Sequence, residues 1–200
     1  MRNRSQVLEL AILGLLHSNP MHGYQLRKRL NEMLGLLRPF SYGSLYPCLR
    51  GLADQGLITS SAEELDAGAV GPSRRGRIVY KLTEAGLGRL ESLLGEAGPA
   101  SWEDENFDVR FAMFAQTDVD TRLRILEGRR ARMAERLDGV TNAIRRGLPS
   151  DPYTQELQRH TLEQVEREVR WLEDLIDSER DSRLTPSHAS SQPTRKKEHQ

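Results

Sequence analysis

The feature of this sequence that most constrains its fold is a change of hydrophobic period near residue 57. Before that point, apolar residues recur every three or four positions, which predicts amphipathic helices. These predicted helices cover residues 6–17, 22–34 and 41–55. After it, residues 57–61 and 77–82 read as short strands, joined by a loop rich in Gly, Pro, Ser and Arg. Three helices followed by a strand, a basic loop and a strand predict a winged helix-turn-helix.

The rest of the chain returns to the helical period. Thr83 is a predicted N-cap for a fourth helix that ends at Leu94. A Gly/Pro-containing linker follows at 95–101, then a short helix and two long ones, predicted at 106–115, 120–146 and 153–180. We therefore predict a mainly α fold with a small β-wing. Its parts are a winged helix-turn-helix DNA-binding domain at 1–95, a C-terminal helical dimerisation domain at 102–182 and a disordered tail at 183–200.

The net charge of zero hides an uneven distribution. Residues 1–94 contain 12 Lys and Arg and 8 Asp and Glu, which gives +4. Residues 95–200 contain 17 and 21, which gives −4. A basic front half suits contact with nucleic acid, although many ordinary domains carry such a charge.

The third predicted helix has one apolar face, made of Leu45, Leu49 and Leu52. A helix of this kind fits the major groove of DNA and presents its N-terminal residues to base edges. The candidates for DNA contact on this helix are Ser41, Tyr42, Ser44, Tyr46, Pro47 and Arg50. The alternative is that they are ordinary solvent-facing residues of a small helical domain.

Three arginines lie in or beside the wing, namely Arg74, Arg75 and Arg77. A basic hairpin can enter a minor groove or lie along phosphates. The alternative is a solvated surface loop.

The third predicted helix contains a proline and the single cysteine of the chain. Pro47 lacks the N–H that a helix interior requires, so the helix either bends there or starts near Ser44. Cys48 is the only cysteine, which excludes an intramolecular disulfide. Its thiol could act as a redox switch, but a buried small hydrophobic residue is the more ordinary interpretation.

The second long helix carries an apolar seam at alternating spacings of three and four, made of Leu162, Val165, Val169, Leu172 and Ile176. Such a seam needs a partner, and we predict that a second copy of the chain provides it. The alternative is an antiparallel hairpin with the first long helix, without a role in dimerisation.

Several segments together resemble the PadR family of transcriptional regulators. They are LELAILGLL at 8–16, HGYQL at 22–26, GSLYPCLRGLADQGLI at 43–58, RIVYKLT at 77–83 and the EAG that follows. The likeness is tight over residues 7–94, and residues 105–180 resemble more loosely the helical domain of the longer PadR subfamily. Cys48 replaces the small residue usual in the family, and the wing loop at 62–76 is rich in glycine.

The resemblance implies a winged-helix homodimer, usually a repressor, on an operator with two-fold symmetry. It also implies a possible small-molecule effector, often aromatic. Six aromatic residues could line a pocket for it, although core packing is the more ordinary role: Trp102, Phe107, Phe111, Phe114, Tyr153 and Trp171.

Other classes of protein fit the sequence less well. We see no metal-ligand spacing among the histidines, no phosphate-binding glycine loop and no nucleophile–base set, so we expect no enzyme, metal or cofactor. The main rival is a winged-helix adaptor that binds protein instead of DNA. We expect a cytoplasmic chain, because there is one cysteine, no signal peptide and no apolar run long enough for a membrane helix.

Overall fold

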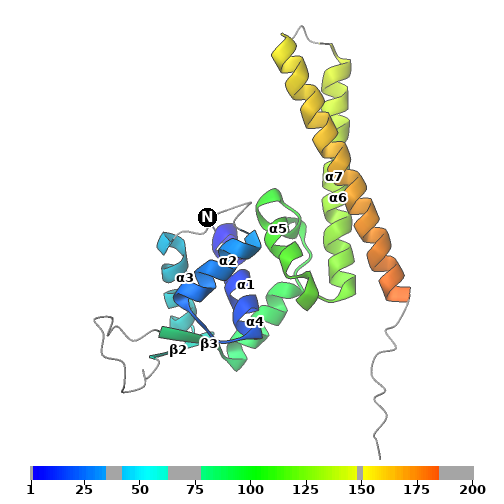
Figure 1. The fold of residues 1–200 in the computed structure, drawn as a ribbon. Coiled ribbons are helices and arrows are strands. Elements are labelled where there is room, and N and C mark those ends of the chain that lie inside the picture. The colour runs from blue at the N-terminus through cyan, green and yellow to red at the C-terminus, as the bar shows by residue number, and fades with distance from the viewer. Residues whose placement is uncertain (1, 35–41, 63–77, 148–150, 185–200) are drawn as a thin grey trace, which may run out of the picture.

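The computed structural model describes residues 2–34, 42–62, 78–147 and 151–184. Their elements, in chain order, are α1 (Arg2–Ser18), β1 (Met21–His22), α2 (Gly23–Leu34), α3 (Tyr42–Asp54), β2 (Ile58–Ala62), β3 (Ile78–Leu82), α4 (Glu84–Leu94), η1 (Pro99–Ser101), α5 (Asp104–Ala112), η2 (Phe114–Gln116), α6 (Val119–Arg145) and α7 (Pro152–Leu184). Helices dominate and the sheet is small, which confirms the predicted fold class of a winged helix followed by a helical domain (Figure 1).

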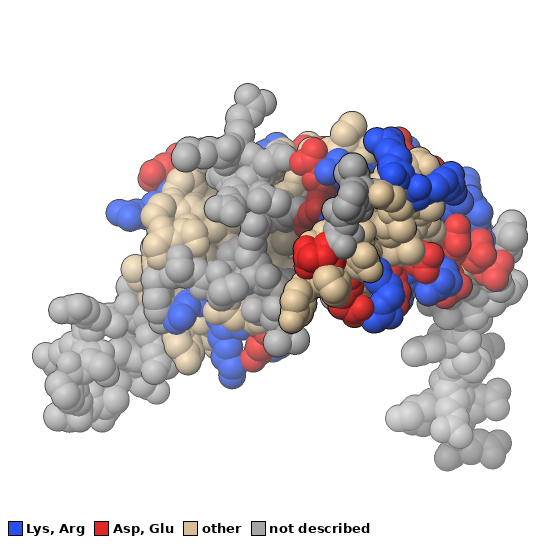
Figure 2. All heavy atoms as spheres, turned by 90° about the horizontal axis from the view of Figure 1, so that it is seen from above, with Lys and Arg blue, Asp and Glu red and all other residues tan. Residues whose placement is uncertain are grey.

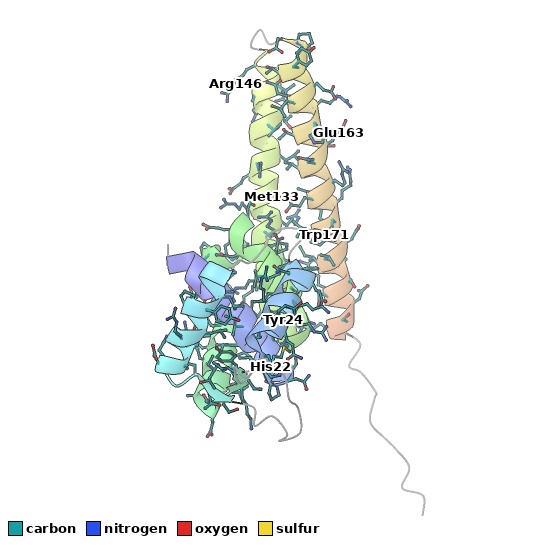
Figure 3. The ribbon with its side chains drawn as sticks, turned by 60° about the vertical axis from the view of Figure 1, so that its left-hand side comes forward. His22, Tyr24, Met133, Arg146, Glu163 and Trp171 are labelled. Carbon is teal, nitrogen blue, oxygen red and sulfur yellow. The ribbon has the colours of Figure 1, made fainter. Side chains whose placement is uncertain are left out.

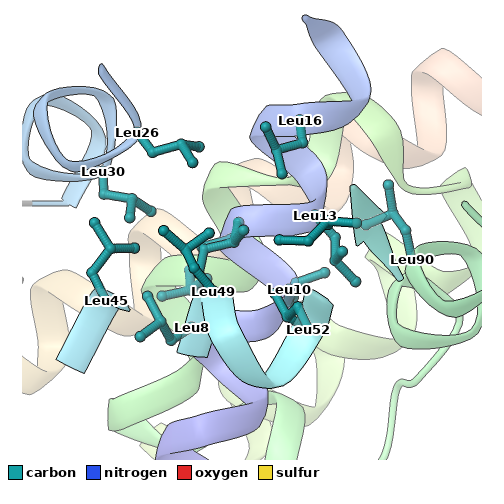
Figure 4. Close-up of a cluster of buried hydrophobic side chains, with 14 of the residues drawn as sticks. Leu8, Leu10, Leu13, Leu16, Leu26, Leu30, Leu45, Leu49, Leu52 and Leu90 are labelled. Carbon is teal, nitrogen blue, oxygen red and sulfur yellow. The ribbon is translucent and has the colours of Figure 1, made fainter. Parts of the chain in front are cut away.

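The core of the N-terminal domain is built mainly from leucine. Side chains from α1, α2, α3 and α4 converge on one cluster (Figure 4), including Leu13, Leu26, Leu49 and Leu90, each at most 1% exposed. α1 lies at the centre of this cluster, and its residues 10–14 are all buried. This explains why apolar residues lie on more than one face of α1, because the helix packs against other helices on several sides.

The sheet has three antiparallel strands in the order β1-β3-β2. β2 and β3 form the predicted hairpin, with Ser60 opposite Tyr80. The third strand, β1, has only two residues, and it pairs Met21 with Tyr80 and His22 with Val79. No periodicity can be read from two residues, so the sequence did not predict this strand.

α5 joins the two halves of the molecule. Val109 and Met113 belong to the N-terminal core cluster, whereas Phe107 belongs to a second cluster with α6 and α7. The guanidinium of Arg110, 9% exposed, donates to the backbone oxygens of Leu93 and Glu96 at the end of α4. The predicted linker at 95–101 is therefore held in place, and part of it forms the short helix η1.

α6 and α7 form an antiparallel pair that projects beyond the rest of the chain, which we call the arm (Figure 1). At its base the ring of Trp102 lies on Gly128: a Cβ built at Gly128 would be 2.3 Å from the ring. Arg129, beside it, pairs with Asp104 and donates to Glu168 at 2.8 Å and to the backbone oxygen of Trp102 at 3.1 Å. These contacts fix the base of the arm to α5 and its N-terminal flank.

The surface of the arm carries both signs of charge. Viewed from above, basic and acidic side chains are interspersed on the arm side of the molecule and do not form separate patches (Figure 2). Many are paired across the two helices, as Arg122 is with Glu179 at 2.8 Å and Arg180 with Glu127 at 2.9 Å. None of the helices in the described part of the chain is long and apolar enough to cross a membrane.

Candidate nucleic-acid interface

α3 presents a polar face next to the sheet. Leu45 and Leu49 are fully buried in the leucine core and Leu52 is 3% exposed, so the inner face of the helix is fixed. The opposite face is open, and the predicted contact residues Ser44, Tyr46, Pro47 and Arg50 are all exposed. α3 can therefore offer these side chains to a groove of DNA without losing its packing.

Pro47 lies inside α3, five residues after the first residue of the helix. The alternative that the helix starts near Ser44 is thus wrong, because the helix begins at Tyr42. Pro47 deprives Gly43 of the usual helical hydrogen bond from residue 47, and its ring points to the exposed side. Pro47 also lacks a side-chain donor, so it can contribute only shape to a DNA contact.

Tyr46 connects the two most specific motifs of the sequence. A Cβ built at Gly23 would lie 3.1 Å from the Tyr46 hydroxyl oxygen and 3.2 Å from its Cε1. Glycine at the start of α2 therefore makes room for the tyrosine of α3. Tyr46 remains 37% exposed, so one side of its ring packs and the other faces solvent.

The wing strand β3 approaches the same place. Burial raises the pKa of the Tyr80 hydroxyl, the nearby Tyr46 raises it further, and the positive charge of Arg50 acts in the opposite direction. These interactions put the base of the wing next to the exposed face of α3. Arg50 and Tyr46 thus lie where α3 approaches Tyr80 of β3.

His22 holds the start of α2 through its backbone. Its N–H donates to the side-chain oxygen of Gln25 at 3.0 Å, three residues on, in the manner of one half of a capping box. The same residue pairs with Val79 of β3. His22 thus joins the start of α2 to the sheet through its backbone.

Thr83 and Gly86 lock the hairpin to α4. The Thr83 hydroxyl donates toward the backbone oxygens of Gly56 and Leu57, at 2.7 and 2.9 Å, and accepts from the Gly86 N–H at 3.0 Å. A Cβ at Gly86 would fall 2.0 Å from the Leu57 oxygen. The predicted N-cap is confirmed, and the EAG motif after it allows the close approach of α4 to the start of β2.

Cys48 is partly buried on the inner side of α3 and packs against the leucine core. Burial, with a smaller contribution from the negative charge of Glu9, raises the pKa of its thiol to about 11. A thiol in this state is a poor nucleophile, because the thiolate is the reactive form. The geometry favours a packing role over a redox switch.

We therefore expect Cys48 to resist alkylation. At pH 8 roughly one thiol in a thousand is ionised at this pKa, whereas an unperturbed cysteine is substantially ionised. Iodoacetamide should react about two orders of magnitude more slowly with the native protein than with the urea-unfolded chain. Equal rates in the two states would show that the thiol is accessible and ionised, contrary to its burial.

Of the remaining predicted contact residues, the structure describes one. Tyr42 is the first residue of α3. Ser41, Arg74, Arg75 and Arg77 lie outside the described residues. Their proposed contacts with DNA stay predictions.

α2 carries a basic segment that was not among the predicted DNA contacts. The side chains of Lys28 and Arg29 are 65% exposed, and they lie at the long ion-pair distances of 3.8 and 3.7 Å from Glu32. The first helix of a helix-turn-helix crosses the DNA backbone, so these cations are further candidates for phosphate contact. The run of three basic residues at 27–29 was the signal in the sequence.

Most of the predicted dimer seam is buried within the single chain. Val165, Leu172 and Ile176 are 4%, 0% and 3% exposed in the single chain. Leu172 and Ile176 belong to the same buried cluster as Leu123 and Leu126 of α6. The prediction that these three residues face a second copy must therefore be corrected in favour of the hairpin alternative, while Leu162 and Val169 are partly buried.

The aromatic residues also pack mainly against one another. Phe111 lies 5.0 Å from Phe114 and 5.3 Å from Trp171 between ring centroids, and Phe107 stacks on Phe111 at 5.8 Å. Phe107 and Phe114 are buried, whereas Tyr153 is 87% exposed near the tip of the arm. These distances support core packing, and the six aromatic residues do not line one cavity. Within the described residues, no group of three His, Cys, Asp or Glu side chains could hold a metal ion.

The N-terminal part of the chain is similar to known transcriptional regulators. Residues 12–92 match the profile of the transcriptional regulator PadR-like family. The negative transcriptional regulator PadR of Bacillus subtilis (strain 168) is 30% identical over 89 residues, which is 44% of this chain and 46% of the relative. The chain thus aligns with about half the length of this curated relative.

The solved structures of Bacillus subtilis PadR with operator DNA and with p-coumaric acid are both 22% identical to this chain. They cover 86% and 87% of it and 99% of their own chains, with TM-scores of 0.41 and 0.39. The matched profile, together with the motifs that bring Tyr46 onto Gly23 and Thr83 onto Gly56, shows that residues 12–92 are similar to the PadR-like family of transcriptional regulators.

Proposed function

We propose that this chain is a sequence-specific DNA-binding regulator that acts as a homodimer on a two-fold symmetric operator. The observation that carries the proposal is the open polar face of α3, with Tyr46 and Arg50 beside β3, above an inner face that is completely buried. Each protomer would place α3 in a major groove and its wing along the flanking backbone. Lys28 and Arg29 of α2 would contact phosphates.

The direction of regulation is proposed from the relative. The curated protein that shares 30% identity over 89 residues is a negative regulator, so we propose repression. We propose the cytoplasm as the place of action, since a regulator of this family needs access to the chromosome. Residues 1–95 would bind DNA and residues 102–182 would form the dimer, and α5 packs on the cores of both.

We further propose that a small-molecule effector releases the DNA, as the family resemblance implies. An effector can shift the balance only if it binds the two conformations with different affinity. The base of the arm, where Arg129 joins Asp104, Glu168 and Trp102, is the place where a bound molecule could alter the angle between arm and winged helix. Such a change would alter the distance between the two copies of α3.

The test is a fluorescence-anisotropy titration with DNA from the protein's own promoter region, at two salt concentrations and with a scrambled competitor. Specific binding with two protomers per site is expected, and log affinity should fall with log salt by roughly 0.9 per neutralised phosphate. Equal affinity for the scrambled DNA, or no affinity at either salt concentration, would contradict the proposal. That outcome would favour the winged-helix adaptor, whose affinity for a protein partner should depend little on Arg50.

A further inference from the structure

A second stripe of residues runs along α7, on the side away from the seam that packs on α6. Its members alternate at spacings of four and three and are all exposed: Tyr153, Leu157, His160, Gln164, Arg167 and Trp171. We call these six residues the outer stripe. Residues with this spacing share one face of a helix, as in a coiled-coil seam. α7 therefore has two seams: α6 covers the inner one, whereas the outer one is exposed, with Trp171 packing in part on α5, 5.3 Å from Phe111.

The outer stripe is unusually apolar at its two ends. Tyr153 is 87% exposed, Leu157 is 64% exposed and Trp171 is 40% exposed. Between them the surface is hollowed into a groove of about 400 Å³, lined by His160, Gln164, Arg167, Glu168 and Trp171. Figure 3 shows Trp171 on the part of α7 near the winged-helix domain and Glu163 higher on the arm. An apolar helix face with such a groove is suited to another helix.

The residues of the outer stripe are arranged symmetrically about Leu162, so that its members lie in pairs at equal distances on either side of it. Tyr153 and Trp171 are equally far from Leu162, and so are Leu157 and Arg167, and His160 and Gln164. When two copies of a helix pair antiparallel about a two-fold axis, residues equally far from the axis face each other. An axis at Leu162 thus sets aromatic against aromatic, and a leucine against the aliphatic stem of an arginine. His160 and Gln164 meet at the centre.

One pair of charges beside the outer stripe, Glu156 and Arg170, agrees with this pairing, whereas Glu163 lies next to its own copy near the axis. Glu156 and Arg170 lie on the same flank of the stripe and at equal distances from Glu163, which is close to the axis. Arg170 makes no ion pair with any described residue, while Glu156 faces solvent with Arg159 at 2.6 Å. In the antiparallel pair, Arg170 of each copy approaches Glu156 of the other. Residues at such flanking positions set the orientation of paired helices.

From the homodimer proposed above, we infer that two copies of this chain pair antiparallel through the outer stripe of α7, with the two-fold axis at Leu162. Trp171 and Tyr153 are the anchors, because tyrosine, tryptophan and arginine carry most of the energy in protein interfaces. The central layer of His160 and Gln164, which already bond each other at 2.9 Å in one chain, fixes the register. The partner's Tyr153 then covers the exposed side of the tryptophan.

The first test is sedimentation of Tyr153→Asp and Leu157→Asp. Neither side chain is buried in the single chain, so both variants should fold, and both should raise the dimer Kd at least about tenfold. The matched control is Ile144→Asp, which places the same charge on an exposed apolar residue of α6 near the same end of the arm. The control should sediment as the wild type does.

The second test locates the axis. In a Cys48→Ala background, Glu163→Cys should be captured with its own copy by a short bis-maleimide linker. Asp177→Cys is on the same side of α7 two heptads further on, and should not be captured. Arg170→Glu should weaken the dimer, and Glu156→Arg in the same chain should restore it.

The outcomes separate this inference from the proposed function. A wild-type dimer that survives Tyr153→Asp and Leu157→Asp, and is not captured at residue 163, overturns the pairing but leaves the homodimer. A wild-type chain that is monomeric at micromolar concentration, and binds operator DNA as a monomer, overturns both. Binding of a small aromatic molecule in the groove of a chain whose dimer is unaffected by the stripe variants would assign the groove to an effector.

Discussion

Gly86→Ala is expected to destabilise the winged-helix domain by about 3 kcal/mol or more. The added methyl group would lie 2.0 Å from the Leu57 oxygen and 2.8 Å from Cδ1 of Leu82. The first of these is a backbone atom, which no rotamer change can move. α4 would have to shift away from the hairpin, which also strains the bonds of Thr83 to Gly56 and Leu57. Urea unfolding followed by circular dichroism measures the loss.

Gly88→Ala is the matched control. Gly88 is in the same helix two residues later, and nothing lies within 4 Å of a Cβ built there. Since alanine is the better helix former by up to about 1 kcal/mol, this variant should be more stable than the wild type. If both variants change stability by the same amount and sign, the close approach of α4 to Leu57 is not what glycine provides at residue 86.

Arg50→Ala is expected to cost about 1–3 kcal/mol of operator binding at each half-site, and so twice that for a dimer. Arg50 lies on the exposed face of α3, and its charge acts on Tyr80 at the base of the wing. Loss of a base contact should relax specificity at one position of each half-site. Loss of a phosphate contact should instead weaken all sequences equally and lower the salt slope by about one per arginine. Anisotropy titrations against the operator and its single-base variants distinguish the two.

Arg145→Ala is the control for charge alone. Arg145 is an exposed arginine in the last turn of α6, near the tip of the arm and far along the chain from α3. Its removal changes the net charge by the same amount as Arg50→Ala, so affinity should fall little. A loss as large as that of Arg50→Ala would mean that overall charge, not α3, governs DNA binding. Sedimentation should show that both variants keep the oligomeric state of the wild type.

Much of the fold follows from local patterns. The boundaries of α3 and α4, the hairpin of β2 with β3, and the cap at Thr83 can be read from the spacing of leucines, the alternation in the strands and the position of a single threonine. These features depend on neighbours within a few residues, which a sequence displays directly. The exposed face of α3 follows in the same way, because three buried leucines fix the opposite side.

Other features depend on contacts between distant segments. β1 exists only because Met21 and His22 meet Tyr80 and Val79, far along the chain. The reason for Gly23 is the ring of Tyr46, and the reason for Gly86 is the backbone oxygen of Leu57, just before β2. Each of these positions is visible in the sequence as a glycine, but the group that requires it is not.

The seam of α7 shows the same division between sequence and tertiary structure. The sequence by itself determined that the helix is amphipathic and that its seam needs a partner, because alternating spacings of three and four always create one apolar face. Only the tertiary structure decided which partner buries Leu172 and Ile176, since α6 and a second copy offer similar surfaces. The short connection between α6 and α7 favours packing on α6 over packing on a second copy, because closing a short loop costs little entropy. That choice leaves the outer stripe of α7 exposed, and it is this stripe for which we propose a second copy as the partner.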